Sequence, residues 1–408
     1  MVLIYNFTIT LYRLVMMIIS PFNEKAALWI RGRKNFFRKW QGFDASGRKV
    51  IWFHCASLGE FEQSRPVIEE IKRRDSNVFI LLTFFSPSGY EIRKDTPLAD
   101  STCYLPADTS SNARKFVETF RPDVAVFVKY EFWYYFISEL KRNSIPLYLI
   151  SANFRPEQIF FRWYGGWFCK ILQMFSHIFV QSERSRKLLN SIGVNHLSVE
   201  GDTRFDRVHF LASKSREIPV AAKFAAGSFV LVAGSTWPVD HSFFVRFINE
   251  TEHDIKLIIA PHQIDEKEID ILLKQLRKPA VRYSRVTEEY LSVARVMIID
   301  NIGILSSLYA YGDLSYIGGG FGKNIHNILE ACAHSVPVMF GPKYNNFLEA
   351  HALIAAGGAF PVKGYDDIHE RINEFYLNRE FLKRAGDIAG RYVESGIGAS
   401  KRIVDKIL

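Results

Sequence analysis

Residues 314–330 read LSYIGGGFGKNIHNILE: an apolar run, a turn that holds four glycines, and a polar stretch that leads into a helical pattern. Glycines at such a turn let the chain bend tightly and let main-chain amides approach an anion. Strand, glycine-rich turn and helix together form the repeating unit of a parallel α/β sheet. The stretch therefore predicts an α/β fold with a ligand site at the carboxyl end of one strand.

Short apolar runs alternate with helical patterns on both sides of this stretch. In the second half of the chain the expected strands are Phe229–Ala233, Lys256–Ala260, Val296–Ile299, Leu314–Ile317 and Val336–Phe340. In the first half they are Val50–His54, Val78–Thr83, Val124–Val128, Leu147–Ser151, His177–Val180 and His196–Val199. The alternation predicts two Rossmann-like halves, each with a mostly parallel sheet covered by helices.

The length of 408 residues is enough for two domains of about 150–200 residues each. We expect an N-terminal segment at 1–40, a first α/β domain at 41–207, a linker at 208–227 and a second α/β domain at 228–408. The linker is placed where a polar stretch interrupts the strand and helix pattern. The last helix is a candidate to pack back on the first domain.

The N-terminus has the composition of a membrane-associated segment. Residues 2–21 read VLIYNFTITLYRLVMMIISP, about the length that spans a bilayer, but Arg13 near the middle favours a helix that lies on the surface. Residues 1–50 hold nine Lys and Arg against two acids, so 9 − 2 = +7 of the total net charge of +9 lies there. The basic flank predicts a cytoplasmic-side membrane surface. A helix packed on its own domain is the alternative.

Composition excludes several other classes of protein. Hydrophobic residues make up 48% of the chain, which indicates a folded protein. The four cysteines form no CxxC pair, so we expect neither a metal site nor a disulfide framework. Zinc-finger spacing and RNP-like aromatic motifs are also absent, so we expect no nucleic-acid partner.

Candidate catalytic residues follow strands of the first half. In the run from His54 to Glu60, Glu60 falls in the first turn of the next helix, where the helix dipole favours a carboxylate. Such a carboxylate can act as a general base or simply cap the helix. Lys129 and Glu131 follow another strand, and Arg204 can hold a phosphate or carboxylate bidentately. A surface loop is the alternative for Arg204.

Candidate ligand-binding residues follow strands of the second half. The turn around Gly319 can bring amides to a phosphate, and Glu330 can accept hydrogen bonds from ribose hydroxyls. The spacing is neither that of a Walker A loop nor that of a Rossmann dinucleotide site. Pro261-His262 ends a neighbouring strand. Gly341-Pro342 ends another strand, where it either contacts a ligand or forms a simple turn.

Taken together, these motifs resemble the 3-deoxy-D-manno-octulosonic acid (Kdo) transferases that act on lipid A precursors. Each motif alone is weak, and their common order and spacing over nearly the whole chain carry the resemblance. They are Trp29-Ile-Arg31-Gly32-Arg33, His54-x-x-Ser57-x-Gly59-Glu60, Thr83-x-x-Ser86-Pro87-Ser88-Gly89, Tyr104-Leu-Pro106-x-Asp108, Gly318-Gly319, His326-Asn327-x-Leu329-Glu330 and Gly341-Pro342-x-x-x-Asn346-Phe347.

The resemblance implies a GT-B fold: two Rossmann-like domains with a cleft between them, plus the N-terminal membrane-associated helix. It implies an inverting, metal-independent transfer of Kdo from CMP-Kdo to the lipid A precursor lipid IVA at the inner membrane, with no cofactor. The domain at 41–207 is then the acceptor domain and that at 228–408 the CMP-sugar-binding domain. Glu60 matches the general base, and Arg204 matches a cation that stabilises the leaving phosphate. The residues expected to contact the donor are Pro261, His262, Gly303, Ile304, Leu305, Gly319, Asn327, Ile328, Leu329 and Glu330.

Two positions depart from the family pattern. Lys129 stands where the family commonly has an acid assigned to the transition state, so either Glu131 covers that role or Lys129 grips an anion. His262 stands where relatives commonly have arginine, so an imidazole can bind the donor phosphate in place of a guanidinium.

Two other functions remain open on the sequence. Nucleotide-sugar 2-epimerases share the two-half architecture, although they need no membrane attachment. A non-catalytic, membrane-docked protein that binds a nucleotide sugar is the second alternative, and the departure at Lys129 keeps it open.

Overall fold

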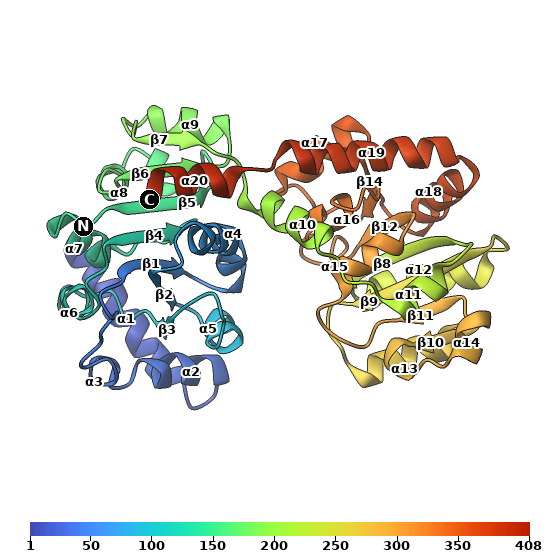
Figure 1. Cartoon of the computed structure of the whole chain (residues 1–408), viewed down its shortest axis with the longest axis horizontal. Coiled ribbons are helices and arrows are strands. Elements are labelled where there is room, and N and C mark those ends of the chain that lie inside the picture. Colours follow the sequence, from blue (N-terminus) through green and yellow to red (C-terminus); the bar gives the residue numbers. More distant parts are fainter. The chain divides into compact units, whose positions relative to one another are not determined.

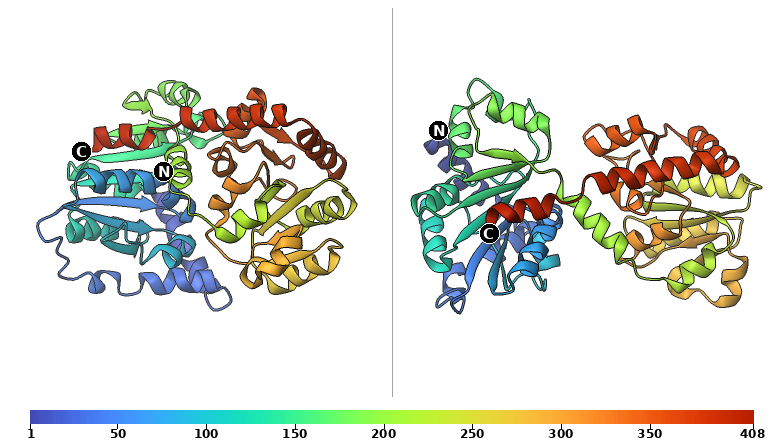
Figure 2. Two further views of the ribbon diagram at one scale, coloured as in Figure 1. Left: turned by 45° about the vertical axis from the view of Figure 1, so that its right-hand side comes forward. Right: turned by 45° about the horizontal axis from the view of Figure 1, so that its top comes forward.

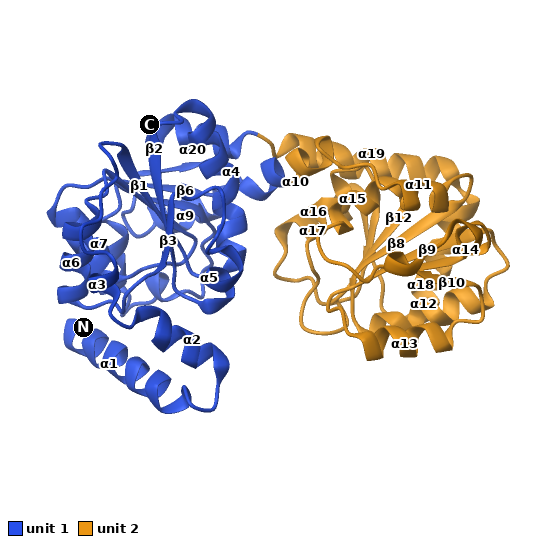
Figure 3. Cartoon of the chain, turned by 60° about the horizontal axis from the view of Figure 1, so that its bottom comes forward, with its two compact units in different colours: residues 1–207, 398–408 blue, residues 208–397 orange.

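The computed structural model describes all 408 residues, and the chain divides into two compact units. The first unit is Met1–Arg207 together with Gly398–Leu408, and the second is Val208–Ile397 (Figure 3). Each unit contains one parallel sheet of seven strands.

The first sheet has the strand order β3-β2-β1-β4-β5-β6-β7 (Figure 1). Its strands are β1 Lys49–Cys55, β2 Val78–Phe84, β3 Ser101–Tyr104, β4 Val124–Val128, β5 Leu147–Ala152, β6 His177–Val180 and β7 Leu197–Val199. The helices are α1 Val2–Ile19, α2 Glu24–Arg33, α3 Phe36–Lys39, α4 Leu58–Arg74, α5 Pro87–Arg93, α6 Ser110–Phe120, α7 Tyr134–Arg142, α8 Gly166–Leu172, α9 Glu183–Asn190 and α20 Ala399–Ile407. Helix α10 (Thr203–Ser213) begins in this unit.

Alternating side chains of the first sheet enter two separate cores. Trp52 packs with the face covered by α6, α7 and α8, where Phe116, Phe127 and Phe136 surround it. Phe53, the next residue, belongs to the opposite core under α4 and α20. Period-two alternation of buried apolar residues on both faces requires helices on both faces, which is why the strands read as continuous apolar runs.

The second sheet has the order β10-β11-β9-β8-β12-β13-β14. Its strands are β8 Phe229–Thr236, β9 Ile255–Pro261, β10 Ala280–Arg282, β11 Val296–Ile298, β12 Leu314–Ile317, β13 Val338–Phe340 and β14 Ala359–Pro361. The helices are α11 Pro219–Ala225, α12 Pro238–Glu250, α13 Glu266–Gln275, α14 Glu288–Val293, α15 Leu305–Leu308, α16 Leu329–Cys332, α17 Leu348–Ala356, α18 Tyr365–Leu377 and α19 Arg379–Ser395.

The predicted α/β class is confirmed, and every expected strand is present. Three strands were not expected, namely β3, β10 and β14, and each lies at an edge of its sheet. Edge strands are short and partly exposed, so they lack the continuous apolar run that marks a central strand. The residues assigned to a linker, 208–227, include the end of α10 and the whole of α11.

Each sheet contains one point where the strand order reverses. The chain moves from β1 to β2 on one side and returns to place β4 on the other side of β1. In the second sheet β8 is likewise flanked by β9 and β12. Crossover helices diverge at such a point, so the loops after the two central strands lie next to each other.

The C-terminal helix α20 packs on the first sheet (Figure 2). Asp206 on α10 fixes its start, because one carboxylate oxygen accepts from the amide of Gly398 at 2.6 Å. The other oxygen accepts from both the amide and the hydroxyl of Ser400, each at 2.8 Å. Asp206 thus acts as a helix cap supplied from a distant part of the sequence.

We expect Asp206→Ala to lower the free energy of unfolding by about 1–2 kcal/mol, the usual cost of a lost helix cap. Urea unfolding of the full chain measures this. Asp405→Ala is the matched control, since the pair of Asp405 with Arg74 is half exposed and contributes at most about 1 kcal/mol. Equal losses in the two variants would contradict the capping role.

Candidate functional site

Glu60 lies in the first turn of α4, directly after the central strand β1. Its Oε2 atom accepts a hydrogen bond from the amide of Ser57 at 3.1 Å and a short one from the Ser57 hydroxyl. These bonds form a capping box, so Glu60 does cap helix α4, which was the alternative to a role as general base. It engages only Oε2, however, and Oε1 faces the ammonium of Lys129 at 3.9 Å. The structure therefore leaves one oxygen of a fixed carboxylate beside a cation.

Lys129 follows β4, which lies beside β1 because the strand order reverses there. Its backbone lies in the left-handed region, with φ of 62°, which few non-glycine residues adopt. The amide of Lys129 donates to the carbonyl of Ile150 at 3.0 Å, so the neighbouring strand helps to hold this conformation. The turn directs the chain from β4 into the segment that carries Glu131.

Glu131 belongs to a buried polar network rather than to the pair of Glu60 and Lys129. Its Oε2 atom lies 3.0 Å from Nε2 of His54 and accepts from the Trp133 indole at 2.7 Å. On the other side of the His54 ring, Nδ1 lies 2.9 Å from the hydroxyl of Thr83. That hydroxyl also accepts from the Trp52 indole at 2.8 Å. His54 is fully buried, so this chain fixes Glu131 relative to the end of β1.

Arg204 lies in the first turn of α10 and pairs with Asp202. Its Nε donates to one Asp202 oxygen at 2.8 Å, and its backbone amide donates to the other at 2.9 Å. The preceding residue, Thr203, donates from its hydroxyl to the carbonyl of Gln63 in α4 at 2.7 Å. The start of α10 is thus packed on α4, the helix that carries Glu60 in its first turn.

In the second unit, a cavity of about 410 Å³ lies at the carboxyl ends of β8, β9 and β11. Pro261, His262, Gly303 and Leu305 line it, so the structure brings together four of the residues expected to contact the donor. The other lining residues are Ser235, Ala260, Gln263, Ile264, Ile299, Asn301 and Ile302. Ile304 caps the short helix α15 beside the cavity.

The glycine turn follows β12 and is held by a buried carboxylate. Gly319 has φ of +89°, and its amide lies 3.4 Å from a carboxylate oxygen of Asp240. Asp240 also accepts from the Tyr316 hydroxyl at 2.6 Å and from the amide of Trp237 at 2.8 Å. Burial raises the pKa of Asp240. A side chain at Gly318 would meet the backbone of Ser235 at 2.2 Å, so β8 and β12 pack too closely for any other residue.

The remaining expected donor contacts lie at the start of α16. The Asn327 amide group donates to Glu330 at 3.0 Å, and its oxygen accepts from the amide of Leu329 at 3.2 Å. Ile328 and Leu329 are fully buried, so their side chains belong to the interior of the second unit. Asn327 therefore positions Glu330 and caps the helix at the same time.

Trp237 and Asp240 link β8 to the glycine turn, and neither was among the residues expected at the site. Trp237 precedes α12 and donates from its indole to Nε2 of His326 at 3.1 Å. The signal in the sequence was present, since Trp237-Pro-Val-Asp240 places proline at the first helical position and an acid at the third.

The N-terminal helix α1 docks on the first unit through polar contacts at one side. The Tyr5 hydroxyl donates to Asp108, which also accepts from the amides of Tyr135 and Phe136 at the start of α7. Burial raises the pKa of Asp108 to about 6. The helix has a mean hydropathy of 1.8 and no buried residue, so by length and composition it can cross or lie on a membrane. Its exposed apolar residues are Leu3, Ile4, Phe7, Leu11, Leu14, Val15, Met17, Ile18 and Ile19.

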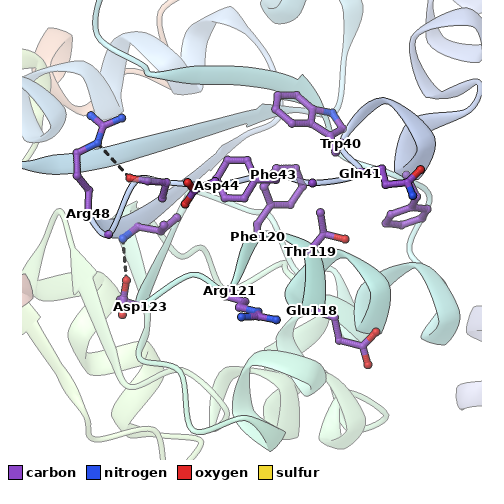
Figure 4. A pocket seen from close by; sticks show the side chains of 15 residues that line it. Trp40, Gln41, Phe43, Asp44, Arg48, Glu118, Thr119, Phe120, Arg121 and Asp123 are labelled. Atoms are coloured by element: carbon purple, nitrogen blue, oxygen red, sulfur yellow. Dashed lines mark hydrogen bonds between the residues drawn. The ribbon is translucent and has the colours of Figure 1, made fainter.

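A larger hollow of about 610 Å³ lies elsewhere on the first unit (Figure 4). Trp40, Phe43 and Phe120 line it, together with Asp123, which accepts from the amide of Val50 at 2.7 Å. It therefore lies at the amino ends of β1 and β4, opposite Glu60 and Lys129. Ligand sites of open α/β sheets lie at the carboxyl ends, so we place the functional site there despite the smaller cavity.

Comparisons with known proteins identify the class of the chain. The fold matches UDP-GlcNAc 2-epimerase from Neisseria meningitidis bound to UDP-GlcNAc, with a TM-score of 0.62 and 17% identity over 88% of this chain and 98% of that one. It also matches HepE from Anabaena in complex with UDP, with a TM-score of 0.56 and 12% identity over 88% and 99%. The chain therefore has the GT-B-like fold of two doubly wound α/β units, as predicted.

Comparison of the amino-acid sequence gives more specific relatives than the fold does. The model of the 3-deoxy-D-manno-octulosonic-acid transferase (Kdo transferase) family matches residues 30–207. The Kdo transferase of Aquifex aeolicus is 27% identical over 88% of this chain and 96% of its own length. That of Rickettsia prowazekii is 26% identical over 88% of this chain and 78% of its own length. The chain is therefore similar to the Kdo transferases, which are glycosyltransferases, over most of its length.

We expect Thr83→Val to lower the free energy of unfolding by about 1–3 kcal/mol, because it leaves buried groups of Trp52 and His54 without their shared partner. Chemical denaturation measures the loss. Thr102→Val on the partly exposed strand β3 is the control and should change stability by about 0.5 kcal/mol or less. Similar values for the two variants would show that the network contributes nothing to stability.

Proposed function

We propose that this chain transfers Kdo from CMP-Kdo to a hydroxyl of the lipid A precursor lipid IVA, with inversion at the anomeric carbon and without a metal. In this proposal the first unit holds the acceptor and the second unit holds the donor. Similarity to the Kdo transferases supports the reaction class. The observation that carries the mechanism is the fixed Glu60 carboxylate beside Lys129, at the point where the first sheet reverses.

The donor is a cytidine nucleotide whose phosphate and sugar carboxylate are both anionic. The cavity lined by Pro261, His262, Gly303 and Leu305 lies at the carboxyl edge of the second sheet, where such ligands bind in this class of fold. The imidazole of His262, which lines this cavity, supplies a donor for the anion. Glu330, held by Asn327, supplies an acceptor for ribose hydroxyls.

The acceptor hydroxyl must lose its proton as its oxygen attacks the anomeric carbon. Glu60 is the candidate base: Ser57 fixes Oε2, and Oε1 remains to take the proton. The bond from the anomeric carbon to the phosphate oxygen breaks as the new glycosidic bond forms, and CMP leaves with the electron pair. Arg204 is the candidate cation for the departing phosphate. Lys129, 3.9 Å from Glu60, keeps that carboxylate oriented and adds positive charge for an anionic substrate.

The acceptor is a membrane lipid, so the protein must reach a membrane surface. Helix α1 exposes a continuous set of apolar side chains, and the segment after it, RGRKNFFRKW at 31–40, carries five of the cations in the first 50 residues. Apolar side chains insert among lipid chains while cations contact anionic headgroups. These features support the proposal that the protein works at a membrane surface, on the cytoplasmic side of the inner membrane.

The direct test incubates the purified full chain with CMP-Kdo, generated in the reaction, and lipid IVA in detergent with a chelator. Mass spectrometry of the lipid should show an increase of one or more Kdo units. An unchanged lipid, from protein that is folded and binds CMP, contradicts the proposed acceptor. Epimerisation of a UDP-sugar by the same preparation would favour the epimerase instead.

We expect Glu60→Gln to lower kcat by a factor of about 10²–10⁴, the usual contribution of a general base. Glutamine can still close the capping box with Ser57, so thermal stability should stay close to that of the wild type. The variant thereby separates the chemical role of Glu60 from its capping role. Glu62→Gln, two residues further on the same helix, is the control and should retain activity. Turnover of Glu60→Gln within a factor of two of the wild type would exclude Glu60 as the base.

We expect the double variant Phe7→Asp, Leu14→Asp to lose binding to vesicles that contain anionic phospholipid, because both side chains are exposed on α1. Burial of one such side chain contributes about 1.5–3 kcal/mol, so loss of two should lower the partition coefficient by at least about 100-fold. Flotation of vesicles with bound protein measures this. The apolar double variant Phe7→Leu, Leu14→Ile should still float, and flotation of both variants would contradict attachment through α1.

A further inference from the structure

Three rings after strands β8, β9 and β12 form a stacked group in the second unit. The rings of Trp237 and His326 are nearly parallel, with 14° between them, and the Trp237 indole donates to Nε2 of His326 at 3.1 Å. The ring of His262 lies against both: its centroid is 4.7 Å from Trp237 and 4.2 Å from His326, with interplanar angles of 28° and 21°. Trp237 and His326 thus form a platform on which His262 stacks.

The platform assigns different roles to the two imidazoles. Nε2 of His326 accepts the indole hydrogen bond, so that nitrogen carries no proton and the His326 ring is neutral. Burial, and then the neighbouring His262, lower the pKa of His326 to about 4. His262 is the more exposed ring and lines the cavity proposed for the donor. A proton taken up at this site therefore goes to His262, where an indole face stabilises a cation.

Charged groups around His262 are engaged elsewhere. On α12, Asp240 accepts from Tyr316 and from backbone amides, and His241 bonds to Thr236. On the segment after β9, Asp265 caps α13 and Glu266 pairs with Arg282. Beside the cavity, Asp300 pairs with the same Arg282. None of these acids is bonded to His262, so an anionic ligand can pair with a positive charge on its ring.

We propose that His262 is a proton-linked anion-binding residue: binding of the donor phosphate protonates His262, and the imidazolium stacked on Trp237 and His326 holds that phosphate. This inference rests on the proposed donor site, and it adds that binding of the anion there depends on pH.

The direction of the pH dependence follows from linkage. Burial lowers the pKa of His262 in the unliganded protein, so the ring is mainly neutral near pH 7. A bound anion favours the charged ring and raises that pKa. Binding therefore takes up a proton, and affinity for the anion increases as pH falls from about 8 towards 6, by at most about tenfold per pH unit for one group. The gain ends below the pKa of the unliganded ring.

The test is isothermal titration calorimetry of the full chain with the methyl phosphodiester of cytidine 5′-monophosphate. This probe has one fixed negative charge, whereas the second ionisation of CMP itself falls at about pH 6 and would obscure the result. Titrations in two buffers of different ionisation enthalpy give the number of protons bound. We expect uptake of up to about one proton near pH 7 and an affinity that rises about three- to tenfold from pH 7.5 to 6.5. Cytidine, which lacks the anion, should bind without pH dependence.

His262→Arg is the matched variant. Its permanent cation should bind the phosphodiester with little proton uptake and little pH dependence, while His262→Gln should bind weakly at every pH. Wild-type binding without proton uptake, or uptake that persists in His262→Arg, overturns the inference and leaves the donor site intact. Absence of binding by the wild type to both phosphodiester and cytidine overturns the donor site, and the inference with it.

Discussion

The reversal of strand order beside β1 and beside β8 is the constraint on which the candidate site residues of each unit depend. Parallel strands are joined by right-handed crossovers, so a chain that first winds to one side of a central strand and then to the other leaves two loops side by side. In the first unit these loops carry Glu60 and Lys129, 69 positions apart in the sequence (129 − 60). In the second they carry Trp237 and His326, which share a hydrogen bond.

Each unit has an acidic side chain at the equivalent position, in the first turn of the helix that follows its first strand, but the two side chains have different roles. Glu60 and Asp240 each follow the first strand of their sheet and accept from the amide of the residue that precedes the helix. Asp240 is almost completely buried and its oxygens are taken by Tyr316, Trp237 and Gly319, so it holds the glycine turn in place. The Glu60 side chain retains 18% exposure, and one of its oxygens faces Lys129. Accessibility, rather than residue type, separates the candidate base from the structural carboxylate.

The apolar helix α1 and the candidate active edge of the first unit are connected through a short series of contacts. Tyr5 of α1 reaches Asp108, and Asp108 caps the start of α7 through the amides of Tyr135 and Phe136. Trp133, which donates to Glu131, immediately precedes that helix. The apolar helix is therefore part of the folded first unit as well as its proposed contact with lipid, and the segment that carries Glu131 is held from both sides.

The sequence by itself determined the α/β class, the central strands, the apolar N-terminal helix and the motifs after β1, β9 and β12, because all of these depend on local periodicity and local turn chemistry. It did not predict the edge strands β3, β10 and β14, which are short, are only partly apolar and become strands by pairing with a neighbour. Nor did it give the stack of Trp237, His262 and His326, or the approach of Lys129 to Glu60. Only the tertiary structure decided these contacts, since they join loops that are distant in sequence and meet only where a sheet reverses its order.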